Sequence, residues 1–458
     1  MKTKHICLTL LTVLSFSLFI SIGRADDITA AQSGNWSDTN TWAGGIVPGA
    51  ADDADIPLGI NVVVDTNVVI QFIYDQGTVT MAANSTLEIT TDSSVAPETT
   101  LDASAVGNTV IYSANAYDAK PQDYYNLVLN GLGTFYNGDV PNYPATAMTI
   151  AGDLTISGTT SVQAGADITI GGNLTIGTTN IATSLDCSVA AIVVKSNVVV
   201  NGFLLDLDGR LTNSIGGLET NQFEGNVTVN PGGTWNVSDV TTWSVGGNFT
   251  NLGTIKSAGF GSIAFNGAGN IAGNPFKIKT ITVNGTYAID TTITITTNTP
   301  TLNGTLVFDI ATTNKMIFAA GPNTLYYSGN LTVINSGPAP APGGSYQLFS
   351  APSYDGTFGS TSFPSLPSGL SWVNNLATSG SITVGGSLGS PRLTLEKSGG
   401  QLTLAWDSAT YPGYRVQAQT NSAGVHSSWM PTDSGTVSPY VININPANPP
   451  VFFRLSKP

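Results

Sequence analysis

The sequence predicts an all-β fold, in which a right-handed parallel β-helix, or β-solenoid, is followed by a small β-sandwich. An apolar-Thr-apolar triplet follows a Gly-Asn or Gly-Asp turn in four places, which begin at Gly152, Gly172, Gly225 and Gly329, and the pair Phe249-Thr250 follows a fifth such turn at Gly247. Several copies lie 20 or 22 residues apart, about the length of one solenoid coil. Short alternating runs, bounded by Gly, Asn, Asp and Pro, take the place of any helical periodicity.

Each triplet indicates a strand that places two apolar side chains on one face and a β-branched polar one on the other. The dipeptide before it tolerates a positive φ, which is typical of a tight turn. Such a unit buries its apolar face only by stacking on its neighbours. We therefore expect the copies from about 151 to 333 to form successive coils.

The N-terminal segment has the pattern of a secretory signal peptide. Two lysines precede an apolar stretch from Ile6 to Ile22, and the small residue Ala25 offers a cleavage site. We expect residues 1–25 to be removed and the protein to be secreted, extracellular or on the cell surface, with no membrane insertion afterwards. A retained membrane anchor is the alternative reading of this stretch.

The expected mature chain is acidic. Without the leader, 12 basic residues stand against 29 acidic ones, a net charge of −17. This charge argues against nucleic acid and anionic membranes as partners, and it fits a protein that works outside the cell or collects divalent cations. Cys187 and His426 would be the sole cysteine and histidine, which leaves little material for a disulfide, a zinc site or a catalytic triad.

The chain divides into consecutive segments by composition and strand spacing. Trp36 and Trp42 lie where the first coil needs a lid, and a Pro-rich stretch from Gly337 to Gly344 follows the last repeat. We expect a cap and first coils over 26–100, repeats over 101–335, a C-terminal cap over 336–386, a linker over 387–391 and the sandwich over 392–458.

Three segments resemble known families of secreted bacterial proteins. The paired tryptophans and the Val47-Pro48-Gly49 turn in 33–90 resemble the opening module of β-helix surface proteins and, more loosely, a G8 domain. Residues 346–384 resemble the closing segment of autotransporter-associated β-strand repeats. The strands around Trp406 and Phe453 resemble a fibronectin type III-like domain. These resemblances imply an Ig/fibronectin-like sandwich and a surface architecture, with an autotransporter passenger as one further possibility, but no particular activity.

Two acidic clusters are candidate metal sites. Asp206 and Asp208, with Arg210 beyond them, would point to one side of a strand, where they could bind calcium, act in catalysis or form a solvated turn. A second cluster, Asp52, Asp53 and Asp55, could hold calcium beside the first coil, or could simply consist of turn residues.

Two tryptophans are candidate carbohydrate-binding residues. Trp235 and Trp243 could stack on sugars if they are exposed, although solenoids also stack aromatic rings inside their coils.

We expect a non-enzymatic structural or adhesive protein that presents Thr- and Asn-rich faces to polysaccharide or a cell-envelope partner. No residue is a convincing catalyst, and no cofactor is expected unless calcium binds. The alternative is a polysaccharide-active enzyme, such as a lyase or glycoside hydrolase, or an accessory carbohydrate-binding protein on the same helix. An enzyme of this kind needs carboxylates that converge in a groove.

Overall fold

The computed structural model describes residues 26–91, 95–96, 98–114, 119–131, 134–137, 146–177, 183–186, 190–205, 220–237, 242–257, 261–297, 299–319, 324–420, 429–447 and 449–457. The regular elements of these residues are strands, apart from one helical turn, α1 (Leu376–Ser379), and two 3-10 turns, η1 (Thr39–Thr41) and η2 (Ala43–Gly45). The predicted all-β class is therefore confirmed for this part of the chain. The signal-peptide segment, Cys187 and His426 lie outside it. The chain forms two units, residues 1–120 with 124–133, and residues 121–123 with 134–458.

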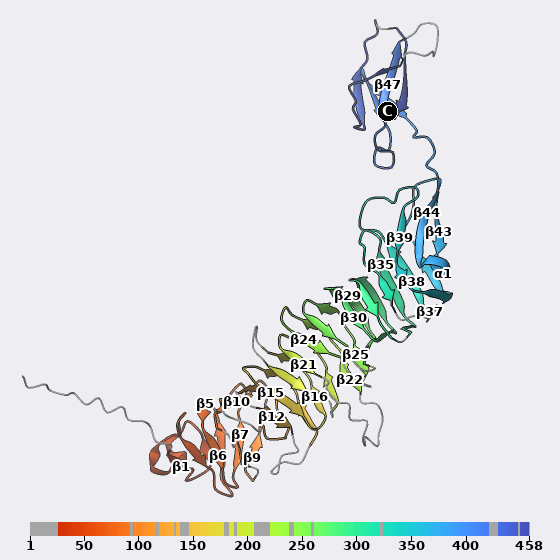
Figure 1. Ribbon diagram of the computed structural model, residues 1–458. Helices are drawn as coiled ribbons and strands as arrows, with labels where there is room; N and C mark the ends of the chain where they lie inside the picture. The colour runs from red at the N-terminus through yellow and green to blue at the C-terminus, as the bar shows by residue number, and fades with distance from the viewer. Residues whose placement is uncertain are drawn as a thin grey trace, which may run out of the picture. The chain divides into compact units, whose positions relative to one another are not determined.

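The first unit contains three parallel sheets, each built from strands of successive coils (Figure 1). One sheet is β1 (Asp27–Thr29), β3 (Asp53–Asp55) and β6 (Phe72–Tyr74). The second is β2 (Gly34–Asn35), β4 (Asn61–Val64), β7 (Thr78–Met81) and β9 (Thr100–Asp102). The third is β5 (Asn67–Ile70), β8 (Thr86–Ile89), β10 (Thr109–Ala114) and β11 (Asn126–Gly131). The chain passes from sheet to sheet and returns one strand further along, as in a solenoid.

Two tryptophans cover the apolar interior at the start of the first unit. Trp36 and Trp42 are 1% and 2% exposed, and their rings meet edge to face with centroids 4.9 Å apart. The indole N–H of Trp42 donates to the carbonyl oxygen of Trp36 over 2.8 Å. Burial with a satisfied N–H suits a residue that must seal an apolar edge.

The second unit contains long parallel sheets of the same kind. The longest runs through β14 (Leu154–Ile156), β17 (Leu174–Ile176), β20 (Val198–Val200), β23 (Val227–Val229), β26 (Phe249–Asn251), β29 (Ala268–Gly273), β32 (Thr286–Asp290), β35 (Thr305–Asp309), β38 (Asn330–Ile334) and β42 (Ser360–Ser362). The next consists of β13 (Met148–Ile150), β16 (Ile168–Ile170), β19 (Ile192–Val194), β22 (Thr220–Phe223), β25 (Thr242–Val245), β28 (Ser262–Phe265), β31 (Thr280–Val283) and β34 (Thr301–Leu302).

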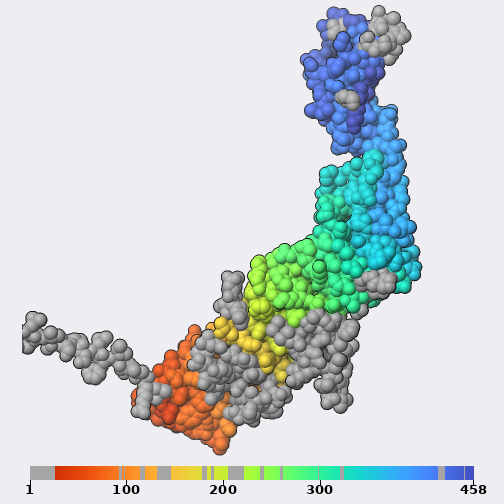
Figure 2. All heavy atoms as spheres, viewed as in Figure 1, coloured from red at the N-terminus to blue at the C-terminus, as the bar shows by residue number. Residues whose placement is uncertain are grey.

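The remaining sides of these coils are formed by shorter sheets. One is β12 (Thr134–Asn137), β15 (Ser161–Ala164), β18 (Ser184–Asp186), β21 (Phe203–Leu205), β24 (Thr234–Asn236) and β27 (Thr254–Lys256). Another is β30 (Phe276–Ile278), β33 (Ile293–Ile295), β36 (Met316–Phe318) and β40 (Phe349–Ser350), and a two-stranded sheet pairs β37 (Thr324–Tyr327) with β41 (Ser353–Gly356). On the face shown in Figure 2, the atoms of residues 261–297, in green, form one continuous surface.

The repeated triplets occupy equivalent positions in successive coils. Leu154 pairs with Leu174 and Thr155 with Thr175, and two coils later Val227 pairs with Phe249. In these strands the first and third members of the triplet are buried and the central one is partly exposed; the third member is apolar except in β26, where it is Asn251. The predicted alternation is therefore confirmed, and it places one side of each strand in a continuous core.

The glycines of the repeat turns serve a different purpose from the one that the sequence indicates. Among them, only Gly329 has a positive φ, of 62°. At Gly225 a Cβ atom would lie 2.4 Å from the carbonyl oxygen of Ser196, and at Gly246 the same distance from that of Glu224. Glycine is needed at these corners because neighbouring coils approach too closely for a side chain.

Antiparallel sheets follow the last coils. The first, in the segment expected to form the C-terminal cap, consists of β39 (Ser345–Gln347), β44 (Ser381–Gly386) and β43 (Leu370–Asn375). The sandwich has two antiparallel sheets, β45 (Thr394–Ser398), β46 (Gln401–Ala405) and β49 (Tyr440–Asn443), and β48 (Met430–Pro431), β47 (Arg415–Thr420) and β50 (Val451–Ser456). Leu404, Trp406 and Val416 form its buried centre and Phe453 packs against them, so the predicted core positions of Trp406 and Phe453 are confirmed.

Replacing Gly225 with Ala should destabilise the solenoid by about 1–3 kcal/mol, because the new methyl group meets backbone that cannot move aside alone. Thermal unfolding and hydrogen exchange of the peptides around Ser196 and Gly225 measure the effect. Gly389→Ala is the matched control, since a Cβ atom at Gly389 has no neighbour within 4 Å. Equal stability of the two variants would contradict the proposed role of close coil contact.

Candidate functional site

The predicted calcium pair Asp206 and Asp208 lies outside the described residues, as does Arg210. The prediction that this cluster binds calcium or acts in catalysis therefore stays untested. Elsewhere, no group of three or more His, Cys, Asp or Glu side chains in the described residues has the arrangement needed to hold a metal ion.

The candidate sugar-stacking tryptophans are in the core of the coils. Trp235 and Trp243 are each 0% exposed, and their rings meet edge to face with centroids 5.2 Å apart. Phe223 and Phe249 extend this contact into a ladder of aromatic rings within the solenoid. Neither indole presents a face to a saccharide in solution, so the structure removes both residues from the carbohydrate-binding candidates and favours the internal ladder.

The second acidic cluster lies on the sheet of β1, β3 and β6 in the first unit. Asp53 pairs with Asp27 on one side and Phe72 on the other, and Asp55 occupies the same position between Thr29 and Tyr74. Phe72 and Tyr74 are half-buried and stack with ring centroids 5.9 Å apart. The sheet thus presents the carboxylates of β1 and β3 next to the aromatic rings of β6.

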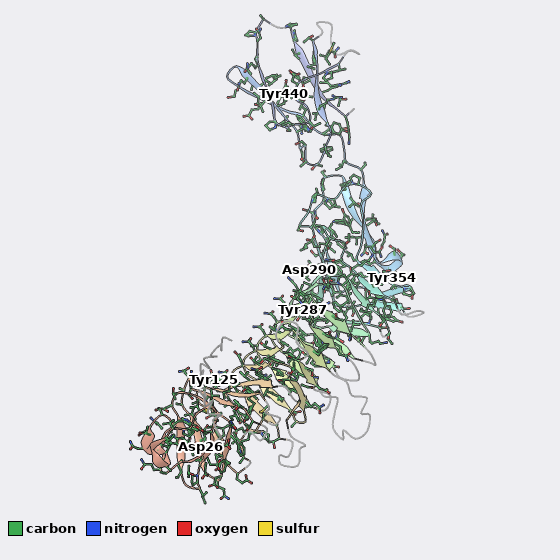
Figure 3. The ribbon with its side chains drawn as sticks, turned by 60° about the vertical axis from the view of Figure 1, so that its left-hand side comes forward. Asp26, Tyr125, Tyr287, Asp290, Tyr354 and Tyr440 are labelled. Atoms are coloured by element: carbon green, nitrogen blue, oxygen red, sulfur yellow. The ribbon has the colours of Figure 1, made fainter. Side chains whose placement is uncertain are left out.

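Asp52 is held apart from this face by the preceding turn. Its Oδ2 atom accepts a hydrogen bond of 2.9 Å from the backbone N–H of Gly49. Its Oδ1 atom accepts one of 3.4 Å from the backbone N–H of Asp26, which is labelled in Figure 3. The carboxylate is therefore occupied as a turn residue. Of the three predicted aspartates, the structure places Asp53 and Asp55 together on a strand and gives Asp52 a separate role.

The electrostatics of this face are unfavourable for the ionised acids. Desolvation by burial, together with the charges of Asp27 and Asp52, raises the pKa of Asp53 above its ordinary value of 3.8. Desolvation likewise raises the pKa of Asp55, with a further contribution from Asp75, although the hydroxyl of Thr29 opposes it by donating a hydrogen bond of 3.0 Å. Like charges directly opposite each other in a sheet destabilise it.

A ladder of amide side chains runs along one corner of the second unit. The backbone N–H of Asn173 donates to Oδ1 of Asp153 over 2.7 Å, and that of Asn197 donates to Oδ1 of Asn173 over 3.2 Å. The same bond joins Asn226 to Asn197 at 3.1 Å and Asn248 to Asn226 at 2.8 Å. Side-chain Nδ2 atoms add parallel bonds, including one of 2.9 Å from Asn226 to Asn197.

A second ladder of side-chain hydrogen bonds connects later coils of the second unit, from Ser244 to Asn303. The Nδ2 atom of Asn266 donates to the hydroxyl of Ser244 over 2.7 Å, Asn284 donates to Asn266 over 2.8 Å, and Asn303 donates to Asn284 over 3.0 Å. All three asparagines are exposed. Sequence reasoning identified the Gly-Asn turns but not this linkage, which depends on the exact stacking of the coils. The outcome is a set of neutral polar edges whose hydrogen-bonding groups are largely satisfied.

Asp53→Asn should stabilise the first unit at pH 7 by a fraction of a kcal/mol, because it removes an ionised group whose pKa is raised in the folded state. The folded state binds protons more readily here than the unfolded state, so stability falls as pH rises from about 3.8 through the raised pKa. The advantage of the variant should therefore shrink as pH is lowered to about 4. Hydrogen exchange of residues 53–55 at the two pH values measures it, with Asp290→Asn as a distant control. A less stable variant at pH 7 would contradict the analysis.

Asn226→Ala should destabilise the coils around it by about 1 kcal/mol, since it removes the acceptor of the Asn248 N–H and the side-chain donor to Asn197. Faster hydrogen exchange at Asn248 and its neighbours is the expected result. Thr228→Ala is the control, because Thr228 lies on the outward side of β23, the strand that follows Asn226. Equal hydrogen-exchange rates at Asn248 in the two variants would show that the ladder does not stabilise these coils.

The described residues contain no helix that is long and apolar enough to span a membrane. Comparison with known proteins adds no relative from which a role could be transferred. No protein-family model, curated protein or solved structure matches this chain. Its function is therefore inferred from its own coils, ladders and charged faces.

Proposed function

We propose that this chain is a non-enzymatic extracellular or cell-surface protein whose β-solenoid serves as a structural or adhesive scaffold. The proposal includes a right-handed coil, cap segments at both ends and a fibronectin type III-like terminal sandwich. It also includes export through the N-terminal segment, and polysaccharide or a cell-envelope component as the partner. The parallel sheets and the antiparallel sandwich support the architectural part of this proposal.

The observation that carries the functional part is the pair of Asn ladders on the solenoid surface. Each rung satisfies the hydrogen-bonding groups of its neighbour, so a long polar edge stays ordered without charged side chains. Such an edge offers repeated amide and hydroxyl groups at the coil spacing. A polymer with regularly spaced hydroxyl groups is a suitable partner because it can meet several rungs at once.

The core supports the scaffold role from the inside. Aromatic side chains stack through consecutive coils, as where Phe265 lies 5.2 Å from Tyr287 between ring centroids. The hydroxyl of Tyr287 donates to the carbonyl oxygen of Val245 over 3.0 Å and links one coil to another. An interior filled in this way leaves the outer faces as the parts of the solenoid that can meet a partner.

The full chain, incubated with a panel of neutral and acidic polysaccharides, with and without calcium, should bind without releasing new chain ends. Cell fractionation of its natural host should place it outside the cytoplasm. Polymer length measured by size-exclusion chromatography, together with a chemical assay for reducing ends, detects cleavage. Polymer cleavage that increases with protein concentration would overturn the non-enzymatic proposal, and retention in the cytoplasm would overturn the extracellular one.

A further inference from the structure

Lysines concentrate on one side of the coils that precede the cap. Between residues 220 and 350, the basic side chains are Lys256, Lys277, Lys279 and Lys315. Lys256 and Lys277 are exposed and the other two are half-buried. In a chain with 29 acidic and 15 basic residues, such a grouping stands out from the general charge.

The register of the sheet places three of these lysines on its outer face. Phe276, Ile293 and Met316 pair across β30, β33 and β36 and point inward. Because side chains alternate along a strand, Lys277 and Lys279 on either side of Ile278 point outward, as does Lys315 before Met316. Backbone bonds extend the pairing to both ends, from Ile293 N–H to the Lys315 carbonyl oxygen over 3.1 Å and from Thr296 N–H to that of Ile278 over 2.8 Å. We call these three side chains the lysine face.

The strand between these lysines is neutral. On β33 and at its ends, Thr292, Thr294 and Thr296 occupy the outward positions and are half-buried. Successive outward positions lie roughly 7 Å apart along a strand, and neighbouring strands are about 4.8 Å apart. The three ammonium groups therefore share one small face without lying directly opposite one another. Among the described residues, the ion pair in the solenoid joins Lys195 to Glu224, so none neutralises the lysine face.

The lysine face leads into a cleft at the start of the cap. This cleft has a volume of about 410 Å³ and lies between the segment Asp309–Lys315 and the strand β39 with Leu348. Lys315 belongs to both the lysine face and the cleft. Asn314, Tyr346 and Gln347 contribute an amide, an aromatic ring and a second amide to its lining.

The ring of Tyr346, on one side of the cleft, packs against other aromatic residues. The ring of Tyr346 meets that of Trp372 edge to face, with centroids 5.8 Å apart, and Trp372 in turn lies 6.0 Å from Phe363. The indole N–H of Trp372 donates to the carbonyl oxygen of Pro364 over 2.7 Å. A half-buried ring held in this way keeps its orientation, which a stacking contact with a sugar ring requires.

Two acidic groups near the cleft offset part of this charge. Asp309 lines the cleft, and its carboxylate accepts hydrogen bonds from the hydroxyl of Ser336 and from the backbone N–H groups of Ser336 and Ala311, at 3.1 Å and 2.9 Å for the latter two. Burial acts to raise its pKa, but these hydrogen bonds outweigh burial and lower it, so the group stays ionised at neutral pH. Asp290, labelled in Figure 3, ends β32, which pairs with the strand β35 that Asp309 ends. Three lysines against these two aspartates leave this part of the surface net positive.

We propose that the lysine face and the adjoining cleft bind an anionic polysaccharide, in which uronic acid residues supply carboxylates to Lys277, Lys279 and Lys315. One sugar ring stacks on Tyr346, and the amide of Asn314 hydrogen-bonds to its hydroxyl groups, while the amide nitrogen of Gln347 is held by the carbonyl oxygens of Phe349 and Ser379. This inference rests on the proposed role as a polysaccharide-binding scaffold and adds the chemical class of the polymer and its place on the chain. Charge complementarity favours an anionic polymer at this face, because three lysines share one sheet here, whereas the first coils of the chain carry aspartates.

The test compares binding of the full chain to polygalacturonate and to a neutral galactan by affinity electrophoresis. The wild-type chain should be retarded more strongly by polygalacturonate than by the neutral galactan, and the retardation by polygalacturonate should weaken as salt rises from about 0.05 M to about 0.5 M. The Lys277→Gln/Lys279→Gln/Lys315→Gln variant should bind at least about tenfold more weakly, because exposed charge pairs contribute modestly but together. Tyr346→Ala should weaken binding while circular dichroism shows an unchanged fold.

The control variant Lys195→Gln/Arg392→Gln/Lys397→Gln loses the same number of positive charges from exposed positions elsewhere and should bind like the wild type. Equal binding by the wild type and the lysine-face variant, or no binding to polygalacturonate at all, would overturn this inference. Binding to vesicles of anionic phospholipid in place of the polysaccharide would also overturn it. Cleavage of the polymer is measured in the same samples, and it would refute the non-enzymatic role while leaving the location of binding intact.

Discussion

The close stacking of one coil on the next is the constraint on which the rest of this structure depends. Parallel strands can share hydrogen bonds only at about 4.8 Å, so every corner must bring backbone against backbone. Gly225 and Gly246 meet this requirement because they have no side chain. Any side chain there would occupy the space of a carbonyl oxygen in the preceding coil. The same spacing lets Asn226 reach both Asn197 and Asn248.

Stacking also divides the side chains into an interior and an exterior that obey different rules. In the interior, the constant spacing between coils lets aromatic rings of neighbouring coils contact one another. Trp235 contacts both Trp243 and Phe249 in this way. Outside, it favours groups that can both donate and accept, which asparagine and threonine provide. The residue types that look most suited to bind sugars by themselves, the tryptophans of these coils, are therefore the ones that the fold withdraws from solvent.

Much of the fold could be predicted from the sequence because its cause is local. The alternation in Leu174-Thr175-Ile176 dictates which side is buried, and it does so in the structure. The purpose of the turn glycines could not be read in the same way, because close approach involves residues 20 or more positions away. The candidate site was harder still: the burial of Trp235, the separate role of Asp52 and the grouping of Lys277 with Lys315 all depend on coil register.

Register also decides where a stacked protein can carry charge. Where Asp27 and Asp53 are directly opposite, their repulsion and the burial of Asp53 raise the pKa of the latter. The lysine face avoids that arrangement, because Thr294 pairs with Lys277 on one side and Ile317 on the other. Its charges can therefore be close together without breaking the ladder beneath them. A polymer that brings its own carboxylates relieves the repulsion that remains, which adds at this face an electrostatic attraction to the hydrogen bonds that the neutral ladders offer.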